Sequence, residues 1–174
     1  MKIKKLTFLW FVQVSLILVL MLVLNNCDNG RDTKVCCSQT GGISLDFSSL
    51  PGGNLVMFTV DKVVGIRIYD EIKRQGTSLL CVGSEEVPPG SGNWKDAAVM
   101  LMFCRLSCSV CKITTEAHGH GPEARIVATR KDGTTQTAVC RDRKVLTLDA
   151  TRDNPFIYAI LSGQEAEWLS FKLE

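Results

Sequence analysis

The sequence lacks the short motifs by which most catalytic centres are recognised. It has only two histidines and contains no G-x-S-x-G, no H-E-x-x-H, no P-loop and no Rossmann glycine pattern. It also has no block of like charge: the formal net charge is +2, and the richest basic cluster, RDRK at 141–144, includes an acid. These absences argue against nucleic-acid binding through phosphate contacts and predict that the protein is not an enzyme.

The N-terminus has the features of an export signal. Lys2, Lys4 and Lys5 precede an apolar run, LTFLWFVQVSLILVLMLVL, over residues 6–24. This run is longer than the usual signal-peptide core of about 7–15 residues and close to the roughly 20 residues that span a bilayer. Two fates of residues 1–26 therefore stay open, cleavage as a signal peptide or retention as a membrane anchor. In both, the rest of the chain is exported.

The apolar run ends in LNNC, from Leu24 to Cys27. This segment resembles the lipobox of bacterial membrane lipoproteins, in which a Leu stands three positions before the modified cysteine, although Asn26 stands where that family usually has a small residue. The resemblance covers residues 1–27 and implies a lipid on the Cys27 thiol. It also implies a location on the periplasmic or cell-surface side of a bacterial membrane. The alternative is an ordinary cysteine beyond an anchor or another cleavage site.

Cysteine is abundant in the rest of the chain. In an exported protein the default state of so many thiols is disulfide bonding. The adjacent Cys36 and Cys37 are not expected to pair with each other, because the trans peptide holds their geometry away from that of a normal disulfide, and we expect them to reach two different strands. Connectivity stays open, as does a fourth bridge if Cys27 carries no lipid. The disulfide candidates are Cys36, Cys37, Cys81, Cys104, Cys108, Cys111 and Cys140.

The body of the chain reads as many short strands separated by turn signals, which predicts an all-β fold with one β-sandwich domain. We expect residues 1–26 to be the signal or anchor, 27–34 a polar tether and 35–174 the sandwich. Loops are expected at 87–93 and 118–123, where Pro and Gly interrupt the pattern. The expected strands lie within 42–47, 54–60, 63–72, 78–83, 125–140, 144–148, 156–161 and 168–173.

The clearest local signal is Asp132-Gly133, which lies between two alternating arms within residues 125–140. An Asp-Gly pair of this kind is typical of a two-residue type I′ hairpin turn. With that turn central, Val127, Ala138 and Cys140 fall on one face of the hairpin, while Ile126 and Val139 fall on the other.

Two segments also fit a short helix. Residues 94–106, WKDAAVMLMFCRL, contain good helix formers, and a helix would place Cys104, Cys108 and Cys111 on one stripe. At the C-terminus, Ser162-x-x-Glu165 is a capping-box pattern, although the alternation in LSFKL favours a strand there.

The function that these features favour is non-catalytic: binding, adhesion or assembly in the cell envelope. The domain would be tied to the membrane by its N-terminal lipid or anchor, with an envelope protein or a glycan as partner, and it would need no cofactor. The alternative is an envelope metal-binding or thiol-redox protein that uses the Cys104/Cys108/Cys111 cluster and the His118/His120 loop. In it, Cys108, Cys111, His118 and His120 would hold zinc or copper, since thiolates and imidazoles suit these metals.

Overall fold

A computed structural model describes residues 35–83 and 96–174. Thr33–Glu174 forms one compact unit. The described strands are β1 (Ile43–Ser44), β2 (Met57–Val60), β3 (Val63–Tyr69), β4 (Ile72–Gln75), β5 (Ser78–Cys81), β6 (Ala97–Met102), β7 (Lys112–Gly119), β8 (Ala124–Arg130), β9 (Thr135–Cys140), β10 (Lys144–Asp149), β11 (Phe156–Gly163) and β12 (Ala166–Leu173), with 3-10 turns η1 (Cys37–Thr40) and η2 (Phe47–Ser49).

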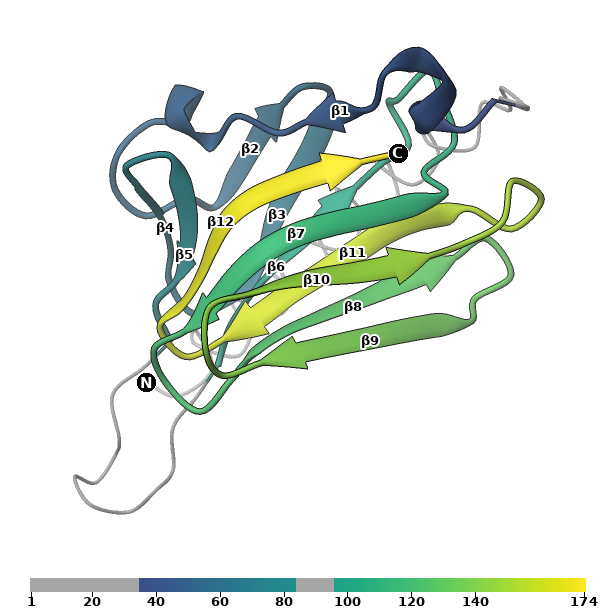
Figure 1. Cartoon of the computed structure of the whole chain (residues 1–174). Helices are drawn as coiled ribbons and strands as arrows, with labels where there is room; N and C mark the ends of the chain where they lie inside the picture. The colour runs from purple at the N-terminus through teal and green to yellow at the C-terminus, as the bar shows by residue number, and fades with distance from the viewer. Residues whose placement is uncertain (1–34, 84–95) are drawn as a thin grey trace, which may run out of the picture. The chain divides into compact units, whose positions relative to one another are not determined.

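These strands form two antiparallel sheets that pack face to face (Figure 1). The first sheet has the order β10-β7-β12-β5-β4, and β1 also pairs with β12. The second sheet has the order β2-β3-β6-β11-β8-β9. The all-β sandwich expected from the sequence is therefore confirmed.

Large apolar side chains fill the space between the sheets. Trp168 and Phe171 project inward from β12, and Leu101 on β6, Leu161 on β11 and Ile126 on β8 project inward from the second sheet; all five are at most 1% exposed. Trp168 and Phe171 are three positions apart and still share the inward face, because a bulge between Trp168 and Ser170 shifts the alternation of β12 by one residue. This core gives two rigid sheets whose outward faces are available for other roles.

The structure corrects two expected segment boundaries and decides the two segments for which a helix was an alternative. The strand expected over 63–72 is divided at Asp70, whose φ is +57°. The loop expected over 118–123 begins later, because His118 and Gly119 belong to β7. Both helical alternatives are wrong where the chain is described: Ala97–Met102 is strand β6, Phe103–Leu106 forms a turn, and the C-terminal segment is strand β12, as its alternation favoured.

The hairpin between β8 and β9 is present, but its turn and register differ from the expectation. Gly133 has a φ of +85° while Asp132 is not among the residues of positive φ, and the Gly133 N–H donates to the Arg130 carbonyl. The loop is therefore a type I turn closed by a glycine, one residue longer than type I′. As a result, Ile126 pairs with Ala138 and shares its face with Cys140, so the expected division of faces is wrong by one position.

The expected export signal, anchor and tether and the expected loop at 87–93 lie outside the described residues. Within residues 35–83 and 96–174, the structure contains no helix whose length and apolar character would let it cross a membrane.

Candidate functional site

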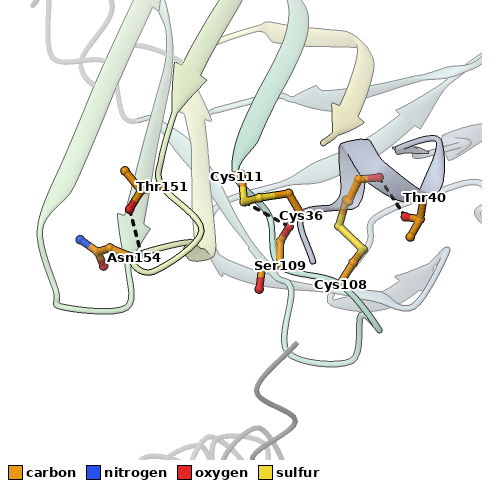
Figure 2. Close-up of a disulfide and its surroundings, with 8 residues drawn as sticks. Cys36, Thr40, Cys108, Ser109, Cys111, Thr151 and Asn154 are labelled. Atoms are coloured by element: carbon orange, nitrogen blue, oxygen red, sulfur yellow. Dashed lines mark hydrogen bonds between the residues drawn. A yellow bond between two sulfur atoms is a disulfide. The ribbon is translucent and has the colours of Figure 1, made fainter. Parts of the chain in front are cut away.

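Two disulfides join the first described residues to the segment before β7 (Figure 2). Cys36 bonds Cys111 and Cys37 bonds Cys108, with Cα–Cα distances of 5.6 and 5.0 Å. The two backbones also lie side by side here, since the Cys37 N–H donates to the Ser109 carbonyl at 2.9 Å. Cys36 and Cys37 thus avoid each other as expected, but both reach one segment instead of two strands. Cys104 is disulfide-bonded as well.

Cys81 and Cys140, two further disulfide candidates, are free thiols in the core, which corrects the expectation for them. Cys81 is fully buried on β5, and this burial raises the pKa of its thiol to about 12. Burial also raises the pKa of Cys140. Thiols are reactive only as thiolates, so both are chemically quiet.

The structure does not assemble the metal site that sequence reasoning placed on Cys108, Cys111, His118 and His120. Both cysteines are oxidised in disulfides and cannot act as thiolate ligands. The two histidines instead come together with Glu167, a residue that the sequence did not single out. One ligand atom from each of His118, His120 and Glu167 lies within 4.8 Å of the others.

The first sheet positions these three side chains on its outward face. His118 on β7 lies directly opposite Glu167 on β12, so the two share a face of the sheet. His120 follows β7 immediately, and its Nε2 lies 3.4 Å from Glu167 Oε2. The two imidazole centroids are 3.9 Å apart at an interplanar angle of 47°. The other carboxylate oxygen, Oε1, accepts a hydrogen bond from the buried Ser78 hydroxyl at 2.5 Å.

Close backbone packing holds the turn that carries His120. A Cβ on Gly121 would lie 2.5 Å from the Gln164 carbonyl oxygen, and one on Gly119 would lie 2.8 Å from the Ala124 nitrogen. Only glycine fits at such distances. The His120 N–H also donates to the Glu165 carbonyl at 3.2 Å, which ties this turn to the one before β12. The H-G-H-G sequence therefore encodes a fixed turn.

The outward face of the second sheet has a different character, which we call the apolar face. The register places it opposite to Leu101 and Ala159, which point into the core. Both tyrosines of the chain lie on it, since Tyr69 pairs with Ala98 and Tyr158 pairs with Met102. The apolar members of this face are Met57, Val64, Ile66, Tyr69, Ala98, Met100, Met102, Val127, Val139, Tyr158 and Ile160. The same register also places Thr59, Arg125, Thr129, Thr135, Thr137 and Ser162 on it.

The side chains of the apolar face range from buried to exposed. Met57, Tyr69 and Val139 are 53, 51 and 46% exposed, and Met100 and Ile160 between them are half-buried. By contrast, the outward face of the first sheet carries mainly charged and polar side chains beside the histidines, including the ion pair between Arg143 and Glu116. The two outward faces therefore suit different ligands.

Comparison with known proteins gives distant structural likenesses alone. No family model and no curated protein matches the chain. A family 29 carbohydrate-binding module, solved in complex with mannohexaose, is 14% identical, with 76% of this chain and 88% of that one covered and a TM-score of 0.46. PfGH50B is 9% identical over 76% of this chain, with a TM-score of 0.38, and this chain spans only 23% of its length.

Proposed function

We propose that this protein is a non-catalytic binding domain of the cell envelope that captures a protein partner on its apolar face. The observation that carries the proposal is the composition of that face, in which methionine, branched aliphatic side chains and two tyrosines extend across all six strands. Met57, Tyr69 and Val139 are the large apolar side chains of this face that are exposed, while Val64, Ala98 and Met102 are buried. Exposed apolar side chains gathered on one face mark interaction sites.

The chemistry of the face favours a protein over a glycan. Met57 and Met100 supply flexible, polarisable surface that adapts to a partner's side chains, and tyrosine is enriched where proteins meet. Recognition of a sugar would require convergent hydrogen-bonding groups, whereas the polar members of this face are mostly single hydroxyls, of Thr and Ser, set among more numerous apolar side chains.

The disulfides support the location. Bonds such as Cys36–Cys111 form and persist in oxidising compartments, which fits the exported body that the N-terminal sequence predicts. The N-terminal segment then ties the domain to the membrane, by the Cys27 lipid or by a retained anchor. These two forms of attachment differ at the Cys27 sulfur. A lipid thioether there excludes a disulfide, whereas a retained anchor leaves the thiol able to form one. The disulfide partner of Cys104 therefore distinguishes them.

Site-specific photocrosslinking in the intact envelope tests the proposal. A photoreactive residue at position 57 or 69 is expected to yield one discrete crosslinked protein, and a second-site Val139→Lys substitution is expected to remove it because the charge must be desolvated on binding. A probe at position 145 is the matched control, since Val145 is 57% exposed but lies on the other sheet.

Equal crosslinking from position 145, or no discrete product from positions 57 and 69, would overturn the proposal. Crosslinks to glycan alone would show that the partner is a carbohydrate and not a protein.

A further inference from the structure

We propose that His118, His120 and Glu167 form a binding site for a divalent transition-metal cation of the zinc class. The inference is independent of the apolar face and of the cysteines, because the three side chains lie on the outward face of the other sheet and include no sulfur.

The ligand set suits zinc by its chemistry. Two imidazole nitrogens and one carboxylate oxygen form a donor set that proteins use for Zn²⁺, with a fourth position left for water or an incoming ligand. Hard cations such as Mg²⁺ and Ca²⁺ prefer sites made of oxygen alone. The imidazole nitrogens of His118 and His120 therefore select against those ions.

The spacing of one donor pair, His120 and Glu167, fits one shared ion. Two ligands at about 2.0–2.1 Å from a tetrahedral zinc lie about 3.4 Å from each other. His120 Nε2 and Glu167 Oε2 are 3.4 Å apart. A charge-assisted hydrogen bond between the same groups would be shorter, at about 2.7–2.9 Å. The pair is thus too far apart for a good hydrogen bond and at the separation of two zinc ligands.

A hydrogen bond from Ser78 orients the Glu167 carboxylate. Outer hydrogen bonds orient the ligands of protein metal sites. Ser78 donates to Glu167 Oε1, which leaves Oε2 directed at His120. The Glu167 side chain is only 14% exposed, while the His120 side chain is 43% exposed. The site is therefore fixed at its base and open to solvent on one side.

The neighbouring guanidinium of Arg143 is already paired. Arg143 lies close enough to Glu167 for the carboxylate to contribute to the raised pKa of its guanidinium, but its main partner is Glu116, through Nε at 2.6 Å. Glu167 therefore keeps an oxygen for a cation.

Calorimetric titration with Zn²⁺ tests the proposal on the full-length oxidised protein without a histidine tag. We expect one ion per chain and no comparable heat with Mg²⁺. Glu167→Gln keeps the shape and the contact with Ser78 but removes the charge, and it should weaken binding at least tenfold, as should His120→Gln. Ser78→Ala should weaken binding by about 10–100-fold, the usual cost of losing an outer hydrogen bond.

The matched control is Asp149→Asn, which removes an exposed carboxylate from the same sheet but away from the cluster, since Asp149 pairs with Lys112 at the opposite end of β7 from His118. It should leave the affinity for Zn²⁺ unchanged. Thermal unfolding without metal checks that each variant is folded. An absence of Zn²⁺ binding, or equal affinity in the wild type, Glu167→Gln and His120→Gln, would overturn the proposal.

Discussion

Individual cysteines in this domain have two different chemical roles, and the presence of a second cysteine within bonding distance decides between them. Cys37 and Cys81 are equally buried, but Cys37 alone of the two is bonded. Cys36 and Cys111 are half-buried and bonded, whereas Cys81 is sealed in the core and stays a thiol. Sequence reasoning assigned the same role to all of them, because an exported compartment makes pairing the default. The distinction could not be predicted, since alternation places Cys81 on the inward face of a strand but does not say which strands face it.

The buried thiol of Cys81 should make stability depend on pH in the alkaline range. Its pKa rises from 9.0 in the unfolded reference to about 12 in the fold because of burial, so between these values the native state keeps a proton that the unfolded state loses. Its contribution is complete below pH 9 and declines as the pH rises toward 12, by up to about 1.4 kcal/mol per pH unit. Urea unfolding of the wild type and of Cys81→Ala at pH 8 and pH 10 measures this contribution to the free energy of unfolding.

The wild type should lose more unfolding free energy than Cys81→Ala between those two pH values. Comparison with the variant removes the contribution of lysines and tyrosines that titrate in the same range. Parallel losses in the two proteins would show that Cys81 has no such effect.

At the scale of elements, alternation predicted the strands well but could not predict how they pair. The Asp132-Gly133 pair located the hairpin correctly, yet Asp-Gly also fits a longer glycine-closed turn, and one added residue moved Ile126 to the other face. Glu167 was missed for a related reason: His120 and Glu167 are 47 positions apart and meet only because β7 pairs with β12. No local pattern carries that information.

The two disulfides join the same pair of elements, so we expect their effects on stability to overlap. Cys36–Cys111 and Cys37–Cys108 close loops with sequence separations of 75 and 71. Once one bridge constrains the unfolded chain, the second closes only a small additional ring and adds little. Removing both should cost about 4 kcal/mol, whereas the double variant Cys36→Ser/Cys111→Ser should cost less than about 2 kcal/mol.

Urea denaturation of the wild type, the double variant and the variant that lacks both bridges measures this overlap. Cys36 and Cys111 are chosen because they are half-buried, while Cys37 is fully buried and its loss would also disturb packing. A cost for Cys36→Ser/Cys111→Ser equal to that of removing both bridges would contradict the overlap.

At the scale of the whole molecule, the sandwich has two unlike outward faces, and two disulfides attach its first described residues to the rest of the domain. The first sheet carries the cluster of His118, His120 and Glu167, and the second carries the apolar face. The disulfides fix the backbone at Cys36 and Cys37, close to where the body follows the N-terminal segment. A domain with two such faces can hold a partner and a cation at once, because the two proposed sites lie on different sheets.

The oxidised state of Cys36–Cys111 and Cys37–Cys108 is the most direct test of this account. Trypsin should release residues 35–62 and 106–112 of the non-reduced protein, isolated from its native cells, as one linked pair of peptides. The pair should be lighter than the reduced peptides by the hydrogens of two bridges, since 106–112 contains both Cys108 and Cys111. Cys81 and Cys140 should be alkylated only after denaturation. Recovery of the two peptides separately, with alkylated thiols at 36, 37, 108 and 111, would contradict the account of an exported, disulfide-stabilised domain.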